Sequence, residues 1–250
     1  MRRWLLPALL LAALIGAWQV AASTGAVADA LHLDPILVPS PAEVAEALWE
    51  NRSLLAENAW VTLQEIVLGF LLGLALGLGV GFLLRPFETL RLAAYPLMVA
   101  SQAIPILVFA PILVVWFDYG IGPKLAVVAL VCFFPIAVAT ADGLRAVDPE
   151  AIKMMRTLDA SRAQLLWRLE APTSLPFVFS GAKIGATFAP IGAVFGEWVG
   201  AESGLGHLIL QDNALLNTSR LFAAAFLLAA IALSLYGLIA LIERRVVTWR

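Results

Sequence analysis

Long apolar runs alternate with short polar connections along the whole chain. Six runs are long enough, at about 20 residues, for a helix to cross a hydrocarbon core. They span residues 5–22, 61–84, 92–117, 125–141, 176–199 and 221–242. This pattern predicts an all-α fold, a polytopic membrane bundle of about six transmembrane helices. The third run is long enough to tilt or break.

A polar segment between the fourth and fifth runs predicts two short helices rather than a span. Asp148 and Pro149 form a helix start, and the first helix should stop near residues 158–159. Ser161 and Gln164 have the spacing of a capping box that opens a second helix, which Pro172 should close. A charged helical hairpin with an apolar stripe is typical of a docking device at a membrane surface.

The amino-acid composition places the chain in a membrane. Of its 250 residues 62% are hydrophobic and 14% are charged, whereas soluble domains average roughly half and a quarter. The single cysteine, Cys132, excludes an intrachain disulfide and is interpreted as a small core residue. The sequence contains no metal-ligand cluster, and His32 and His207 stand alone as loop or surface residues.

Lysine and arginine positions predict the orientation of the spans. Most lie before the first run, after the second, in the polar segment and at the C-terminus, and few lie in the alternate connections. The positive-inside rule therefore places both termini and the hairpin in the cytoplasm.

The N-terminal part divides into an anchor and an outer segment. Residues 1–22 could be a signal peptide, but the apolar run is long for a signal core and favours an uncleaved transmembrane anchor. Residues 23–60 are acidic, and Ser40 with Glu43 opens an amphipathic helix on the periplasmic membrane face. Residues 61–250 then form the core domain, with the polar loop at 142–175.

Small residues and prolines shape the predicted spans. Gly69, Gly73, Gly77 and Gly81 recur every four residues, which favours close packing against a helix of the same chain over a subunit interface. Other spans should be interrupted by prolines, which are tolerated where protein or a wet cavity satisfies the backbone. They are Pro96, Pro105, Pro111, Pro135 and Pro190.

Polar residues within or beside the spans are candidates for a translocation pathway, because an ionisable group at membrane depth is usually functional. The candidates are Ser101, Gln102, Lys183 and Glu197, with Glu65 as a further one. Lys183 could equally extend to the inner surface. Glu65 could reach water at the end of its span, and an outer-loop contact could explain Glu197.

The polar segment resembles the EAA loop of bacterial ABC importer permeases. In its spacing the EAA positions fall on Lys153, Met154 and Met155, the glycine on Asp159, and the I-x-L-P element on residues 169–172. The EAA triplet, the glycine and the leucine are substituted here. Asp tolerates unusual backbone angles, so the turn at Asp159 can persist.

The resemblance implies a MetI-like permease in the bacterial inner membrane whose hairpin is an ATPase-coupling loop. The implied coupling residues are Met154, Met155, Leu158, Asp159, Ala160, Ser161, Leu169 and Pro172. The chain has no phosphate-binding loop, so ATP and Mg belong to a partner and no cofactor is bound here. The implied partners are two copies of a cytoplasmic ATPase, a second permease copy and a periplasmic solute-binding protein, with no nucleic acid.

Within these permeases the chain resembles the branch that serves nitrate, taurine, alkanesulfonates and thiamine-precursor pyrimidines. The likeness lies in residues 101–105, 132–135 and 196–201. We place a pyrimidine or related vitamin precursor ahead of sulfonates, with nitrate behind. An ion-gradient-driven transporter using Glu197 or Glu65, and a scaffold whose hairpin recruits a partner, are the alternative classes.

Overall fold

The computed structural model describes the backbone of residues 2–85, 87–101 and 103–249, and the side chains of these residues except 2–4, 88, 90, 91 and 101. The described part is helical and contains no strand. Its long helices are α1 (Arg2–Ser23), α4 (Arg52–Leu84), α7 (Ile121–Gly143), α10 (Ala171–Trp198) and α12 (Thr218–Val246). The shorter ones are α2 (Ala26–Leu31), η1 (Pro35–Leu37), α3 (Pro41–Glu50), α5 (Glu88–Ser101), α6 (Ile106–Phe117), α8 (Pro149–Thr157), α9 (Arg162–Leu165), η2 (Leu166–Glu170) and α11 (Leu205–Ala214).

The chain forms two compact units. One comprises residues 1–61 and 203–228, and the other comprises residues 62–202 and 229–250. Helices α4 and α12 contribute to both. The polar segment between α7 and α10 lies in the second unit.

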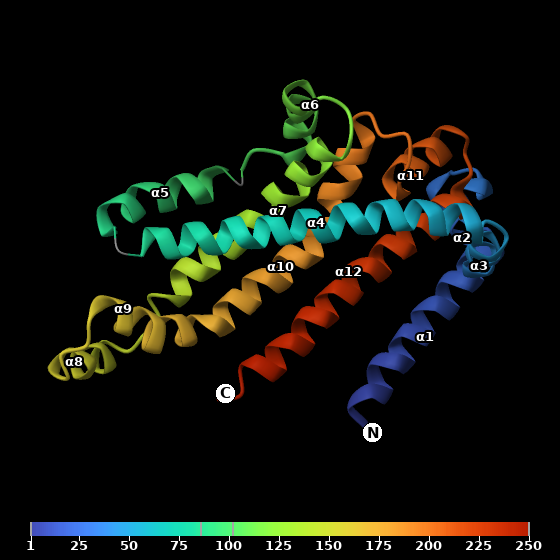
Figure 1. Ribbon diagram of the computed structural model, residues 1–250. Coiled ribbons are helices and arrows are strands. Elements are labelled where there is room, and N and C mark those ends of the chain that lie inside the picture. Colours follow the sequence, from blue (N-terminus) through green and yellow to red (C-terminus); the bar gives the residue numbers. More distant parts are fainter. Residues whose placement is uncertain (1, 86, 102, 250) are drawn as a thin grey trace. The chain divides into compact units, whose positions relative to one another are not determined.

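Helix α7 is the centre of the second unit, and it packs along much of its length against α10 (Figure 1). The glycines of α4 bring this helix close to α7 as well. A Cβ atom on Gly73 would lie 2.7 Å from the Ala129 carbonyl oxygen, and one on Gly81 would lie 2.5 Å from the Thr140 side chain. These distances are too short for a side chain, so the prediction of close packing within the chain is confirmed.

The core of this unit is apolar and dense. Ile66 and Phe70 of α4, Val128, Cys132 and Ile136 of α7, and a row of alanines on α10 are all buried. Cys132 is fully buried, as expected for a small core residue. The alanines, at positions 182, 186, 189 and 193, allow α10 to approach α7 closely.

The third apolar run, which is long enough to tilt or break, is indeed divided. Among the described residues five helices are long and apolar enough to cross a membrane, and residues 92–117 fall in α5 and the short apolar α6. Helix α6 starts at Ile106, directly after Pro105. A proline has no backbone N–H and disfavours helical angles in the residue before it, which explains the break.

The other prolines do not interrupt their helices, contrary to expectation. Pro96, Pro111, Pro135 and Pro190 lie inside α5, α6, α7 and α10, respectively. Pro135 and Pro190 lie in the two helices that pack along each other. Tertiary packing of this kind holds a helix together after the loss of one backbone hydrogen bond.

The first unit combines the N-terminal helices with α11 and the start of α12. The predicted capping box of α3 is present, since Ser40 accepts a hydrogen bond from the Glu43 amide and Glu43 accepts one from the Ser40 amide. The Trp18 ring of α1 stacks on Phe226 with 5.8 Å between ring centroids. Much of α1 otherwise exposes leucine side chains, as a lipid-facing anchor would.

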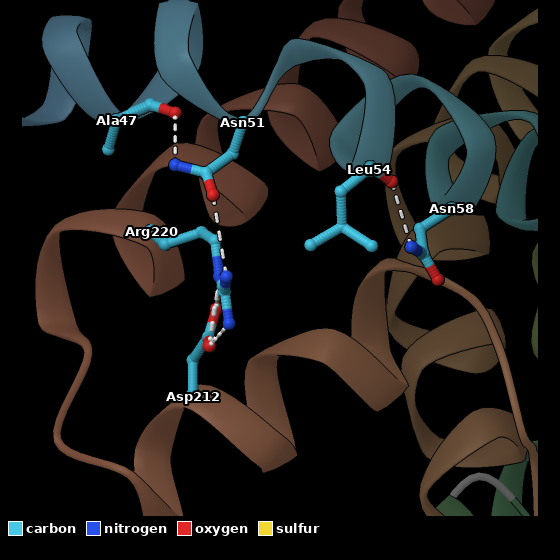
Figure 2. A network of polar contacts seen from close by, with 6 residues as sticks. All are labelled: Ala47, Asn51, Leu54, Asn58, Asp212 and Arg220. Atoms are coloured by element: carbon cyan, nitrogen blue, oxygen red, sulfur yellow. Dashed lines mark hydrogen bonds and ion pairs between the residues drawn. The ribbon is translucent and has the colours of Figure 1, made fainter.

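A buried ion pair organises the same unit (Figure 2). Asp212 of α11 is fully buried and accepts hydrogen bonds from the Arg220 guanidinium, with an Nε–Oδ2 distance of 2.9 Å. Arg220 also donates to Asn51, the residue that ends α3. Asp212, Arg220 and Asn51 therefore join α11, α12 and the end of α3. Loss of either charged residue would leave the other as an unpaired buried charge, which would destabilise the fold.

Candidate functional site: a helical hairpin and buried polar groups

The polar segment folds as a hairpin of α8 and α9 at one end of α7 and α10 (Figure 1). Asp148 caps α8 by accepting a hydrogen bond from the Glu150 amide at 2.9 Å. Ser161 and Gln164 make the predicted capping box, in which the Ser161 amide donates to Gln164 Oε1 at 2.8 Å. These local bonds fix both helix starts, so the hairpin has a defined shape.

The turn between the two helices is built around Asp159. Its φ angle is 55°, in the left-handed region that glycine normally occupies, and the residue stands where the EAA loop has glycine. The Ala160 amide donates to the Met155 carbonyl at 3.1 Å and closes the end of α8. As expected, aspartate adopts the backbone conformation that the turn requires.

The tip of the hairpin exposes apolar side chains. Leu158 is 72% exposed and Met154 is 62% exposed. Met155 and Ala160 are half-buried, while Asp159 and Ser161 are exposed. Two large apolar side chains at the tip of a polar hairpin form a small patch of the kind that marks an interaction site.

Pro172 does not close the second hairpin helix, so that prediction is wrong. Helix α9 continues through the π-helical turn η2 into α10, and Arg162–Trp198 is one helical segment. A proline ring collides with the carbonyl group four residues earlier in a regular helix, and here that carbonyl group, of Arg168, lies in the wider π turn Leu166–Glu170. Leu169 and Pro172 are both half-buried at this junction.

The four predicted pathway residues fall into different environments. Gln102 and the side chain of Ser101 lie outside the described residues. Lys183 of α10 pairs with Glu243 of α12, with 2.7 Å between Nζ and Oε2. The pair holds Lys183 mostly out of solvent, since its side chain is 19% exposed.

Glu197 belongs to a buried polar cluster formed by Thr62, Glu65, Lys124 and Glu197. Thr62 of α4 donates a hydrogen bond to Glu197 Oε1 at 2.6 Å, and Lys124 of α7 donates to Glu65 Oε1 at 2.7 Å. The carboxyl groups of Glu65 and Glu197 also interact. Both are 1% exposed, so the interpretation that Glu65 reaches water is wrong.

Two small residues make room for this cluster. A Cβ atom on Gly196 would lie 3.1 Å from the Lys124 Cα atom, and one on Gly69 would lie 3.2 Å from the Leu125 carbonyl oxygen. The first turn of α7 therefore approaches both α10 and α4. Because the helices lie this close together, the Lys124 side chain is long enough to reach the Glu65 carboxylate.

An apolar cavity of about 350 Å³ lies among α6, α7 and α10. Its aromatic lining comes from Phe109, Phe134 and Phe188, and Pro105 with Ile106 contributes the start of α6. The described lining contains no charged side chain. The remaining lining residues are Ile104, Leu130, Val131, Pro135, Ile184 and Ile191.

Sequence reasoning missed several residues that the fold brings together. Arg85 and Glu170 form a bidentate ion pair, and neither was singled out before. The roles of Thr62 and Asp212 were also missed. The one available signal was an acidic residue, Glu170, close to the start of an apolar run, where a carboxylate requires a partner.

A family model matches most of the chain. It describes the inner membrane component of binding-protein-dependent transport systems and covers residues 69–248. The match includes the hairpin, the cavity lining, and Lys124 and Glu197 of the buried polar cluster.

Curated relatives align over nearly their full length. A probable ABC transporter permease of Haemophilus influenzae is 38% identical over 94% of this chain and 93% of its own. The formylaminopyrimidine transport permease ThiX of Halalkalibacterium halodurans is 36% identical over 86% and 87%, and the riboflavin permease RibX of Chloroflexus aurantiacus is 38% identical over 85% and 80%. Relatives at 27% identity include the aliphatic sulfonates permease SsuC of Bacillus subtilis, a putative assignment, and the taurine permease TauC of Escherichia coli.

The fold also matches a solved transporter. A chain of the methionine ABC transporter MetNI, in an inward-facing conformation, superposes with a TM-score of 0.69 at 21% identity. The match covers 79% of this chain and 98% of that one. The MetI-like helical fold is therefore confirmed, and the chain belongs to the family of inner-membrane components of binding-protein-dependent transport systems as an ABC importer permease.

Proposed function

We propose that this chain is the membrane subunit of an ATP-driven importer whose motor is a separate cytoplasmic ATPase. The exposed tip of the hairpin carries this proposal. Leu158 and Met154 are large apolar side chains that face solvent, and contact with a partner protein would remove them from water. The second helix of the hairpin begins at Arg162, directly after the tip, and is continuous with α10. A push on the tip is therefore delivered directly to a membrane helix.

The coupling surface in this proposal consists of the residues at and beside the turn. Leu158 and Met154 insert into a groove of the ATPase, and Asp159 sets the direction of the turn. Met155, Ala160 and Ser161 line the flanks, while Leu169 and Pro172 connect the hairpin to α10. Two permease copies form a central path, and each binds one of two ATPase subunits.

Orientation and delivery complete the proposal. In this proposal the hairpin and both termini lie in the cytoplasm, and the concentration of lysine and arginine residues in these segments supports that orientation. A periplasmic binding protein delivers solute to the opposite face, and residues 23–60 lie on that side. In this proposal Lys183 and Glu197 contribute to the path, and Ser101 and Gln102 keep the same role from the sequence alone.

The solute we favour is a pyrimidine or a related vitamin precursor. Three phenylalanines line the cavity, and they suit the face of a flat heteroaromatic ring. The amides of Ile106 and Leu107 precede the first backbone hydrogen bond of α6, which runs from Val108 to Pro105, and they can donate to a ring nitrogen or carbonyl. A sulfonate or nitrate would be favoured by a cationic side chain, and the described lining contains none. The names of ThiX and RibX support the same class.

Reconstitution tests both levels of the proposal. The permease is co-purified with its candidate ATPase, placed in vesicles and supplied with a candidate binding protein. We expect uptake of labelled hydroxymethylpyrimidine that requires ATP on the side of the membrane where the ATPase is bound. This uptake should persist without a proton gradient. Uptake driven by a proton gradient without ATP would replace the proposal with a secondary transporter.

The solute is tested separately from the mechanism. The same vesicles are supplied with labelled taurine and nitrate, each with its own binding protein. ATP-dependent taurine uptake without pyrimidine uptake would retain the importer and move the solute to the sulfonate class. Phe134→Ala should lower pyrimidine uptake while ATPase assembly stays intact.

A further inference from the structure

A paired contact joins the hairpin side of α10 to the end of α4. Arg85, directly after the last residue of α4, donates from Nε to Glu170 Oε2 at 2.9 Å and from Nη2 to Glu170 Oε1. Two parallel hydrogen bonds fix the guanidinium against the carboxylate in direction as well as distance. Glu170 is 3% exposed, so the pair lies largely out of water on the carboxylate side.

A second contact runs beside the first in the same register. The Phe82 and Trp167 rings are stacked, with centroids 6.0 Å apart and an angle of 18° between their planes. Phe82 precedes Arg85 by three residues and Trp167 precedes Glu170 by three, so the two contacts join the same two short stretches of the chain. The two segments are thus joined at two successive points, and rotation of one is resisted by the other.

The contact lies where the helix is least regular. Glu170 ends the π turn Leu166–Glu170, which stands between the hairpin helix α9 and the span α10. A π turn inside an α-helix often marks a functional position, because its wider ring can shift its hydrogen bonds by one residue. A motion of the hairpin therefore reaches Glu170 before it reaches the rest of α10.

We infer that Arg85 and Glu170 are positioning residues that transmit hairpin motion to α4 as well as to α10. This inference rests on the proposed coupling to an ATPase. Without the pair, α4 follows the hairpin only through the Phe82–Trp167 stacking and the glycine packing on α7, neither of which fixes a direction. A charge pair suits this role because its geometry is directional, whereas an apolar contact of equal size can slide.

Hydrogen exchange in the assembled transporter tests the inference without knowledge of the solute. The wild-type permease with its ATPase is compared in nucleotide-free form and after trapping with ATP and vanadate. We expect changed amide exchange both in the hairpin, residues 149–165, and at the end of α4, residues 79–85. In Glu170→Gln and Arg85→Gln the hairpin response should persist while the α4 response falls by about five- to tenfold.

Three further variants keep the test decisive. The exchanged pair Arg85→Glu with Glu170→Arg should restore the α4 response, and Arg85→Lys, which lacks the guanidinium fork, should restore only part of it. Glu150→Gln removes the exposed pair with Lys153 on α8 and should change neither response. An α4 response that survives in both single Gln variants, or that the exchanged pair does not restore, would overturn the inference. If amide exchange in the wild-type hairpin is the same in the nucleotide-free and vanadate-trapped states, that result would instead overturn the proposed function.

Discussion

The Lys124 ammonium group lies 2.7 Å from the Glu65 carboxylate, between two helices that otherwise pack through glycine and apolar side chains. The two side chains are only 12% and 2% exposed. Glu197 and Thr62 complete the cluster, which therefore contains two carboxyl groups and one ammonium group. Residues 62–65 of α4, the start of α7 and the end of α10 are held together there by buried polar contacts.

Removal of Lys124 should destabilise this unit. Lys124→Met leaves the buried Glu65 carboxylate without its ammonium partner, and we expect a loss of about 3–5 kcal/mol in the free energy of unfolding. Thermal unfolding of the purified permease in detergent measures it. The double variant Lys124→Met with Glu65→Leu should recover most of the loss, because it removes the carboxylate that Lys124 pairs with, while Glu197 keeps its hydrogen bond from Thr62. Equal instability of the single and double variants would contradict the charge explanation.

Along α4, a large side chain should destabilise the protein at the glycines that contact α7 and be tolerated at a glycine that does not. Gly73→Leu places a side chain where even a Cβ atom would meet the Ala129 backbone at 2.7 Å, so α4 and α7 must separate. Overpacking of this kind costs about 1–3 kcal/mol or more. Gly79→Leu is the matched control, because a Cβ atom there meets nothing within 4 Å. Expression and thermal stability of the two variants should differ clearly, and similar values would refute tight packing at Gly73.

Leu158 should be essential for coupling and dispensable for folding. Leu158→Glu places a charge in the proposed apolar contact with the ATPase, at a cost of about 2–4 kcal/mol in binding if the residue is an anchor. Co-purification of the ATPase and ATP-dependent uptake should both fall, while the amount of inserted permease stays unchanged. Leu158→Met retains an apolar side chain and should behave as wild type.

Asp159→Gly is the complementary change at the turn. Glycine has no steric cost at a φ of 55°, so the variant should retain coupling and gain a little stability in the folded turn. Asp159→Val should lose coupling, because a β-branched residue is strained in this conformation. ATP-dependent uptake by the two variants measures whether coupling is retained. Failure of the glycine variant would show that the Asp159 carboxylate itself contacts the ATPase.

Topology reporters test the orientation that the charge distribution predicts. Fusions after Pro35, Tyr119 and Asn213 should report the periplasm, and fusions after Arg85, Thr157 and Arg250 should report the cytoplasm. The Thr157 fusion matters most, since a hairpin outside the cell could not meet a cytoplasmic motor. A periplasmic signal there would end the coupling proposal.

The sequence alone determined the features that depend on neighbouring residues. The apolar runs predicted an all-helical membrane protein, and the capping boxes at Ser40 and Ser161 appear in the structure as expected. Asp159 adopts the left-handed angle that its place in the turn indicated. Caps and turns are formed by atoms within about four residues of each other, so local sequence contains their causes.

Tertiary structure decided what local rules could not. Helix α10 continues past Pro172, and α7 runs through Pro135, because packing and a π turn compensate for the lost backbone bond. Arg85 meets Glu170 across 85 positions of sequence, and Thr62 meets Glu197 across 135. No periodicity relates such distant residues. Their pairing follows from how closely the small residues of α4 and α10 allow these helices to approach α7, and from the need of a buried charge for a partner.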